Sequence, residues 1–463
     1  MDVFLGVDEL LRAHKRSNKP ASEFNEEILS SIGALLSISG PRFHAAVTSL
    51  ERKNFQDLRT ASGRLVEFVD INPLNREDSF TLVQNFVNES KSNWPEDSIS
   101  KQYIEFAIGA SLGHPRTLEF IAYLIRHKKT VTAADVLNVL AEHFETEAVL
   151  NDFSFDQVAD LLKLAVQAAA LGKLPTENSG KVHVTDKFDV LADDLIKYGV
   201  LMDPVRSLDE STLTTFSPGF FIYCMKKLAK SDNEEHQDLV NALRQIFDDD
   251  KVERQATDRG YIFEGFHLGF LALQMWALGD GEKSLADVFQ HVPRLIKYHK
   301  EELKEVEFVN KTPMKILQAP SEVDFVTTGK NSFKTGSKNL ALHHRPMERG
   351  ADISLWSKTK SGKPLVVAYE CKYRIDDGTS GPTEIQVKSK TDDFREHVSD
   401  EDDMDFVHIF AVRNRMTPKT HDIISTTNDK VIPTFSLDED DLIGLYKNMN
   451  MSPILSLTKN HER

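Results

Sequence analysis

The sequence predicts a multidomain α/β protein. Its 463 residues are too many for one ordinary core, so about two to four domains are expected. Short apolar runs such as VFLGV and PLVVAYECKY are typical of strands, whereas Ile104, Ile108 and Leu112 recur at helical spacing. The hydrophobic fraction of 40% and the charged fraction of 28% are those of a globular protein, which excludes fibrous and disordered classes.

The first predicted segment covers residues 1–150. The strand VFLGV runs directly into Asp8 and Glu9, and a second strand, FHAAVTSL, follows after a helical stretch. Amphipathic helices then continue through YIEFAIGASLGHPRTLEFIAYLIRH, where Gly113 is expected to break the helical pattern. This segment is therefore predicted to contain both strands and helices.

Residues 151–250 are predicted to form a helical module. VADLLKLAVQAAALG and LADDLIKYGVLMD are interpreted as helices, and LTTFSPGFFIYCMKKLAK as part of a short hairpin and a further helix. This order indicates a winged-helix-like or lid-like module. A wing of this kind is able to contact DNA. A structural spacer is the commoner interpretation, because no basic recognition face is visible. The acidic stretch FDDDKVERQATDRG marks the next boundary.

Residues 255–445 are predicted to form a mixed α/β domain around one central sheet, followed by a tail at 446–463. The helix YIFEGFHLGFLALQMWALG is apolar almost all round, as expected of a helix inside a domain. Strand-like runs occur at VEFVNK, VDFVTT, ADISLW, PLVVAYECKY, FVHIFAVRN and VIPTFSL. A helix around EIQVKSKTDDFREHV interrupts them.

Cysteine usage and hydropathy indicate the cellular compartment in which the protein is expected. Cys224 and Cys371 lie far apart without a CxxC motif, which excludes a thiolate zinc site and argues against a disulfide framework. The amino terminus lacks the pattern of a signal peptide, and no stretch is long enough to span a bilayer. We therefore expect a soluble intracellular protein with no membrane partner.

The net charge of −16 argues against a protein that coats nucleic acid through bulk electrostatics. Any contact with nucleic acid is expected to be local. The candidates are KYHKEELK near residue 300 and the run KNSFKTGSKNLALHHRPMER, whose basic residues are Lys330, Lys334, Lys338, Arg345 and Arg349. A solvated loop is an equally good interpretation of the second run.

Three residues near two strand ends carry the predicted chemistry. Glu370 and Lys372 alternate with Cys371 along PLVVAYECKY, so they are expected on one side of the strand. Asp352 begins the neighbouring strand and is expected beside Glu370. Two converging carboxylates suit Mg²⁺ or Mn²⁺, and a nearby Lys stabilises charge that develops in phosphodiester hydrolysis. Alone, however, an E-x-K triplet is more often an exposed, salt-bridged face.

This pattern resembles the PD-(D/E)xK restriction-endonuclease-like superfamily over about residues 255–445. The resemblance implies a core of helix, three strands, helix and strand, in which Asp352 and Glu370 bind metal and Lys372 is catalytic. Glu264, in RGYIFEGF, is similar to the acidic residue that many members carry on the first core helix. Gln386, and less closely Lys388, is similar to the polar residue on the helix after the motif strand. Gly350 and Ala351 stand where many members have Pro.

The amino-terminal segment resembles the second half of a P-loop ATPase of the AAA/STAND type. VFLGVDEL is similar to a Walker B strand, with Asp8 directed to Mg²⁺ and Glu9 to water. FHAAVTSL, with Thr48 and Ser49, is similar to a sensor strand. GHPRTLEF places Arg116 as a second sensor, or is simply the turn that starts a helix. Nothing matches G-x-x-x-x-G-K-[ST], so ATP is not an expected cofactor.

The three segments in this order resemble the Crinkler effectors and the related retrotransposon hot spot proteins. The chain lacks the front of the ATPase and the translocation domain of full Crinklers, which indicates a degraded member or a truncated gene product. The resemblance implies secretion, entry into a host nucleus and action on DNA there, with host nuclear proteins as further partners.

We therefore expect a Mg²⁺-dependent DNA endonuclease. The alternative is a non-enzymatic effector, in which the nuclease-like fold binds nucleic acid or a host protein and the ATPase remnant is a scaffold. The intact site residues favour the enzyme, and the strong acidity favours the scaffold.

Overall fold

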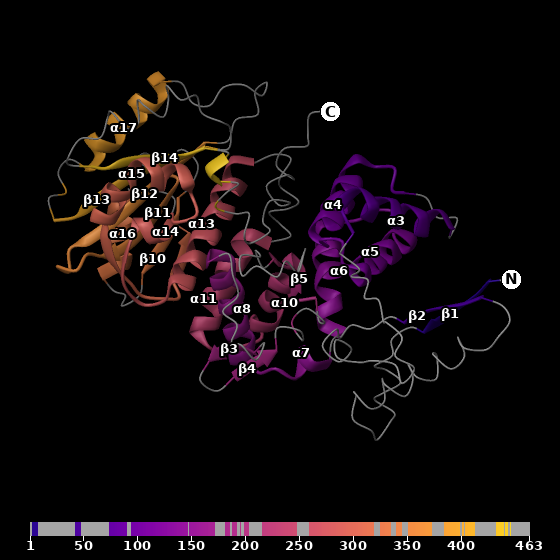
Figure 1. The fold of residues 1–463 in the computed structure, drawn as a ribbon. Coiled ribbons are helices and arrows are strands. Elements are labelled where there is room, and N and C mark those ends of the chain that lie inside the picture. Colours follow the sequence, from indigo (N-terminus) through magenta and orange to yellow (C-terminus); the bar gives the residue numbers. More distant parts are fainter. Residues whose placement is uncertain are drawn as a thin grey trace. The chain divides into compact units, whose positions relative to one another are not determined.

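The computed structural model shows helices and strands along much of the chain (Figure 1). Two compact units contain them, residues 1–72 with 191–198 and residues 73–190 with 199–463. The described residues are 2–7, 42–47, 74–89, 94–146, 148–171, 181–185, 188–191, 195, 199–202, 215–247, 259–318, 325–334, 339–344, 351–372, 384–398, 401, 403–412, 432–438, 440–442 and 445.

The first unit contains a parallel strand pair. β1 (Asp2–Val7) lies beside β2 (Arg42–Val47), with Asp2 opposite Arg42 and Val7 opposite Val47. Both strands were predicted, and both are confirmed. The proposed nucleotide-site residues Asp8 and Glu9 directly follow β1 and lie outside the described residues. Thr48 and Ser49, which follow β2, also lie outside them.

Helices form the first part of the second unit. They are α3 (Arg76–Glu89), α4 (Ser98–Ala110), α5 (Pro115–His127), α6 (Ala133–Thr146), α7 (Ala148–Asp152) and α8 (Phe155–Leu171). The predicted helix through Leu112 ends earlier, at Ala110, because both Leu112 and Gly113 have left-handed backbones with φ of 52° and 74°. A Cβ at Gly113 would lie 1.9 Å from the carbonyl oxygen of Leu74, so this turn requires glycine.

Two short strand pairs follow α8. β3 (Lys181–Thr185) pairs with β4 (Phe188–Leu191), and β5 (Leu201–Met202) runs antiparallel to β6 (Thr215–Phe216). A helix was predicted over LADDLIKYGVLMD. The prediction is wrong at both ends, because Leu191 belongs to strand β4 and Leu201–Met202 form strand β5. α10 (Pro218–Leu228) and α11 (Glu234–Phe247) complete the segment.

The carboxy-terminal part is built on a mixed sheet. Its strands are β7 (Gly281–Ser284), β8 (Glu307–Asn310), β9 (Lys315–Gln318), β10 (Leu340–His343), β11 (Ile353–Lys358), β12 (Pro364–Lys372), β13 (Asp405–Val412) and β14 (Thr434–Leu437). The main order is β14-β13-β12-β11-β10-β9, and β8 pairs with β11 and β7. β10, β11 and β12 are antiparallel neighbours, whereas β13 is parallel to β12. A parallel neighbour requires a crossover, which here contains α17 (Glu384–Val398).

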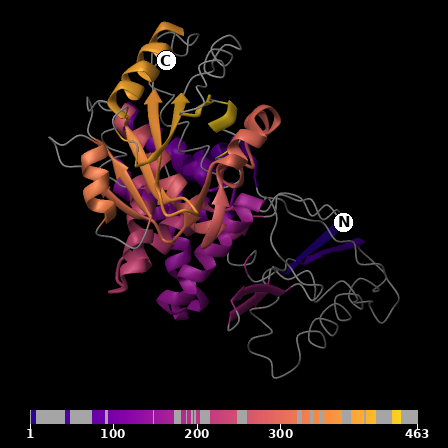
Figure 2. The same cartoon turned by 90° about the vertical axis from the view of Figure 1, so that its left-hand side faces the viewer.

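Helices cover both faces of this sheet (Figure 2). α13 (Arg259–Leu278) packs on one face against β10 and β12, and it also contacts α8, α11 and α14. These contacts explain why α13 is apolar almost all round, as predicted. α14 (Leu285–Val288) leads into α15 (Pro293–Glu305), whose His299 ring meets Phe435 of β14 edge-on. Within the described residues, none of the helices combines the length and apolar character needed to cross a membrane.

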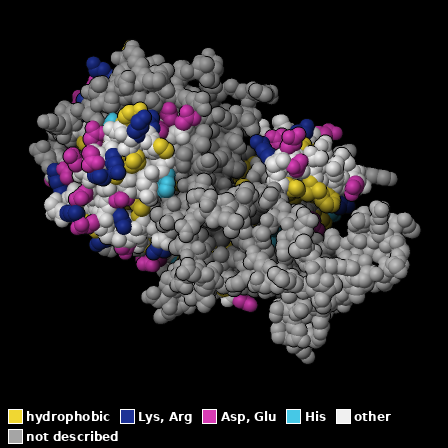
Figure 3. Space-filling model, viewed as in Figure 1, with side chains coloured by type: hydrophobic (Ala, Val, Ile, Leu, Met, Phe, Trp, Pro, Cys, Tyr) yellow, Lys and Arg dark blue, Asp and Glu magenta, His cyan; other side chains and the backbone are white. Residues whose placement is uncertain are grey.

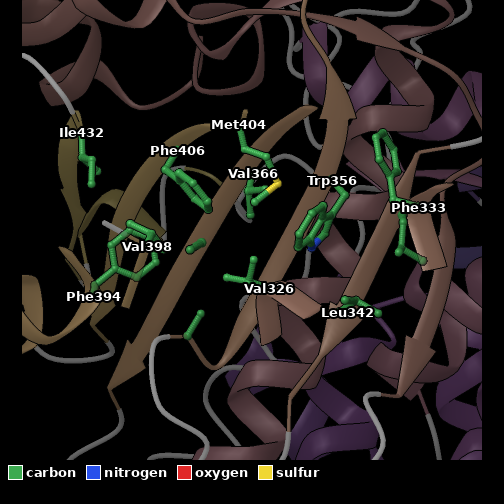
Figure 4. Close-up of a cluster of buried hydrophobic side chains, with 13 residues drawn as sticks. Val326, Phe333, Leu342, Trp356, Val366, Phe394, Val398, Met404, Phe406 and Ile432 are labelled. Atoms are coloured by element: carbon green, nitrogen blue, oxygen red, sulfur yellow. The ribbon is translucent and has the colours of Figure 1, made fainter. Parts of the chain in front are cut away.

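The opposite face carries the apolar core shown in Figure 4, beneath α16 (Phe325–Lys334) and α17. Val366 and Ala368 of β12 alternate onto this face, while Tyr369 alternates onto the α13 face. The core residues are Val326, Phe333, Leu340, Leu342, Ala351, Trp356, Val366, Ala368, Phe394, Val398, Met404, Phe406 and Ile432.

The predicted strand at VDFVTT is wrong, because its last four residues, Phe325–Thr328, belong to helix α16. The buried positions Val326, Gly329 and Phe333 are three and four residues apart, which is helical spacing. A Cβ at Gly329 would lie 1.8 Å from the Trp356 ring, so glycine lets α16 approach the sheet closely. The strands β9 and β10 were not predicted.

Candidate functional site

Asp352 is held at the end of the β11–β12 pair. Ile353 lies opposite Tyr369, and one residue earlier the Asp352 N–H donates to the Tyr369 carbonyl at 2.9 Å. The Asp352 carbonyl accepts from the N–H of His344 at 2.9 Å. Its carboxylate Oδ2 accepts from the N–H of Cys371 at 2.6 Å. The carboxylate therefore lies against the backbone of β12, at the residue between Glu370 and Lys372.

Glu370 lies on the sheet face that α17 covers. Its side chain is buried, and its Oε1 lies 3.2 Å from the ammonium of Lys390 on α17. Alternation along β12 agrees with this placement, because Val366 and Ala368 belong to the core on the same face. The structure thus brings the Glu370 and Asp352 positions together at one end of two neighbouring strands.

Lys372 is the last residue of β12, and its side chain lies outside the described part of the structure. Cys371 is buried with its thiol free of a disulfide. Alternation along β12 places Cys371 on the same face as Tyr369, whose ring meets His267 of α13. Burial of Tyr369 raises the pKa of its phenol.

Glu264 does not share the surroundings of Glu370. It lies on α13, as predicted, and its Oε2 is 3.2 Å from Nε2 of His343 on β10. One turn further along α13, the His267 ring meets Tyr369 edge-on with centroids 5.1 Å apart. Burial lowers the pKa of His267 to about 3. These contacts place Glu264 on the α13 face of the sheet, while Glu370 contacts the helix on the opposite face.

Helix α17 presents different residues from those expected. Gln386 and Lys388 are both exposed, and Lys390 reaches Glu370. Because residues four apart share one side of a helix, Gln386 lies one turn before Lys390 on the same flank. Lys388 lies on the other flank of the buried stripe that contains Val387. Helical spacing therefore puts Gln386, and not Lys388, on the flank of α17 that carries Lys390.

The expected basic surface is only partly described. Lys330 forms ion pairs with Glu401 and, at 3.5 Å, with Asp403, so its charge is offset within the domain. The side chains of the other four basic residues, Lys334, Lys338, Arg345 and Arg349, lie outside the described residues. On the face shown in Figure 3, basic and acidic side chains of the described residues are interspersed.

Arg116, expected as a second nucleotide sensor, lies in the first turn of α5. Its guanidinium donates to Glu119 at 2.7 Å, and both side chains are more than half exposed. His114 caps the helix by accepting from the N–H of Thr117, and Pro115 occupies the first turn. The GHPR motif therefore forms the start of helix α5, as in the alternative prediction of a turn that starts a helix.

The residues at the strand ends fit a hard cation by the chemistry of their donors. Asp352 and Glu370 supply carboxylate oxygens, and Mg²⁺ is commonly held by one or two protein carboxylates together with water and substrate phosphate. Among the residues that the structure describes, no three or more His, Cys, Asp and Glu side chains form a metal-binding group. A cation at this place would rely on the two carboxylates.

Some residues near the site were missed from the sequence. Lys390 has a weak signal, since it lies four residues after Gln386 on the predicted helix. His343 and His344 were assigned to the basic run, but both are buried. His344 Nε2 lies 2.8 Å from the hydroxyl of Ser354, which also accepts from Trp356 Nε1 at 2.9 Å. This buried network supports the strand end that carries Asp352.

No protein-family model, curated protein or solved structure matches this chain.

Proposed function

We propose that the carboxy-terminal domain hydrolyses phosphodiester bonds in DNA with Mg²⁺ or Mn²⁺. The observation that carries the proposal is the Asp352 carboxylate, hydrogen-bonded to the Cys371 amide directly after Glu370. The elements of the sheet domain support it: helix α13 is followed, after the intervening elements β7 to α16, by the antiparallel strands β10, β11 and β12, helix α17, and then parallel strand β13. This is the core order of the PD-(D/E)xK superfamily that the sequence resembles.

Each residue has a distinct role in this proposal. Asp352 and Glu370 offer oxygens to the cation, and their strand positions fix the distance between them. Lys372 stabilises negative charge on the scissile phosphate and orients the attacking water. When bound, Mg²⁺ lowers the pKa of water and screens phosphate charge. Gln386 borders the site from α17, whereas Glu264 supports the domain from the other face through His343.

The cellular setting of this activity is part of the same proposal and rests only on the resemblance of the sequence to the Crinkler effectors. A Crinkler-like effector would be secreted and would act on DNA in a host nucleus, with host nuclear proteins as further partners. The parallel pair β1–β2 is compatible with the Walker B and sensor strands of the suggested ATPase remnant. Asp8 and Glu9 would follow the first of these strands.

Incubation of the purified chain with supercoiled plasmid tests the proposal. Mg²⁺ and Mn²⁺ are compared with EDTA, and Glu370→Ala is the control. We expect nicked or linear products with the unaltered chain and a divalent cation, and none with the control. Uncut plasmid under all conditions, or equal cutting by both proteins, would contradict the proposal.

The second candidate function is a binding protein that does not cleave. The ion pair between Lys390 and Glu370 favours it, because an ammonium offsets the charge that a cation would otherwise use. In that case, fluorescence anisotropy would detect DNA or a partner protein bound equally well in EDTA and in Mg²⁺. Glu370→Ala would leave that binding intact.

A further inference from the structure

Lys390 is a partly exposed lysine that forms an ion pair with the buried carboxylate of Glu370. Its side chain is 44% exposed and extends from α17, while the Glu370 side chain that it meets is 5% exposed. The contact joins Nζ of Lys390 to Oε1 of Glu370 at 3.2 Å. Buried charged groups in proteins are generally paired or bound to metal, because an isolated charge is costly to remove from water. The Lys390 ammonium is therefore a partner for the buried Glu370 carboxylate.

The packing of α17 determines which lysine makes this contact. Val387, Thr391 and Phe394 are buried and form the stripe that faces the sheet. Lys390 lies on the flank of that stripe nearest the end of β12, whereas Lys388 lies on the other flank. A flexible four-carbon stem lets the Lys390 ammonium enter the site or return to solvent without a change in the helix.

We propose that Lys390 is an internal competitor of the divalent cation at the Asp352–Glu370 site. The inference rests on the proposed function, because it assumes that Glu370 is a metal ligand. The ammonium lies against Oε1 of Glu370, where the cation would also bind, so the ammonium must withdraw before the cation takes that oxygen. Lys390 thereby sets a threshold of cation concentration below which the site stays in its ion-paired form.

Two consequences follow from this competition. Removal of the ammonium abolishes the competing ion pair, so a cation binds more tightly in its absence. Because a partly exposed ion pair is of modest strength, the expected change in affinity is about fivefold. Cation binding also returns the Lys390 ammonium to the opening of the site, where a substrate phosphate would approach.

Isothermal titration of the full chain with MnCl₂ alone tests the proposal and requires no cleavage. The proteins are the unaltered chain, Lys390→Ala, Lys388→Ala as a control of equal charge on the same helix, and Glu370→Gln. We expect Lys390→Ala to bind Mn²⁺ about fivefold more tightly than the unaltered chain. Lys388→Ala should match the unaltered chain, and Glu370→Gln should lose the site.

The other outcomes separate this inference from the proposed function. Equal affinity of Lys390→Ala and the unaltered chain, with loss in Glu370→Gln, overturns the competition and leaves the metal site standing. An equal gain in Lys388→Ala overturns it as well, because net charge alone would then explain the effect. No Mn²⁺ binding by any protein overturns both. If Lys390→Ala fails to fold by circular dichroism, Lys390→Met keeps the apolar stem and is judged by the same criteria.

Discussion

The hydrogen bond between the Asp352 carboxylate and the Cys371 amide gives the sharpest prediction about the strand ends. Asp352→Ala removes an acceptor 2.6 Å from a backbone N–H on a buried residue. A buried donor that loses its acceptor costs about 1–3 kcal/mol, so we expect a loss of this size in the free energy of unfolding. Asp352→Asn keeps a side-chain oxygen at the same place and should cost less than about 1 kcal/mol.

Tryptophan fluorescence during denaturation with urea measures this difference. Trp356 is fully buried on β11, the strand that Asp352 precedes, and Trp276 is buried on α13. Replacing Trp94, which lies in the helical region, with Phe leaves these two as the only tryptophans of the chain. All variants are compared in that background, so the signal reports on the carboxy-terminal sheet.

The two Asp352 variants should differ in stability and agree in metal binding. Both lack the charged carboxylate, so both should lose Mn²⁺ binding, because one remaining carboxylate holds a hydrated cation poorly. Equal destabilisation by Ala and Asn, or none by Ala, would refute the role given to the Cys371 hydrogen bond. Mn²⁺ affinity in Asp352→Asn equal to that of the unaltered chain would refute the role given to the charge.

Three further predictions concern other parts of the second unit. Gly329→Ala should destabilise the sheet domain by about 3 kcal/mol or more in urea denaturation, because its Cβ would overlap the fully buried Trp356 ring. Cys371→Ala should keep cleavage activity in the plasmid assay, since the thiol is a packing group, and loss of cleavage with intact circular dichroism would contradict this. His114, whose pKa is lowered from 6.5 to about 4 by burial and by the charge of His143, should make stability fall as pH drops from 6.5 towards 4. His114→Asn keeps a helix cap and should reduce that loss by about 2 kcal/mol between pH 7.5 and 4.5, as measured by denaturation at both pH values.

The strands of the candidate site could be predicted from the sequence because their side chains follow a simple rule. β11, β12 and β13 are mostly apolar and bounded by polar stretches, and β12 and β13 also contain several Val and Ile residues. The intervening helix was predicted with the bounds of α17. Asp352 and Glu370 were expected to lie close together because antiparallel pairing brings the start of one strand beside the end of its neighbour.

Other elements could not be predicted, because their signals are short or depend on distant packing. VDFVTT is rich in β-branched residues over six positions, and the helical spacing appears only when Gly329 and Phe333 are included. β10 is a four-residue strand with every side chain buried, so it shows no alternation. The pairing of Lys390 with Glu370 depends on how α17 packs on the sheet, which the sequence of the helix alone does not specify.

The central claim is that Glu370 binds the cation and Lys372 acts on the phosphate, and the single-turnover rate of DNA cleavage at saturating Mn²⁺ tests it most directly. End-labelled DNA is cut by the unaltered chain, Glu370→Ala and Lys372→Ala. We predict cleavage by the unaltered chain, none by Glu370→Ala, and a rate about a hundredfold lower for Lys372→Ala, a typical loss for one charge-stabilising group. Cleavage by Glu370→Ala at the unaltered rate, or no cleavage by the unaltered chain with any divalent cation, would contradict the account.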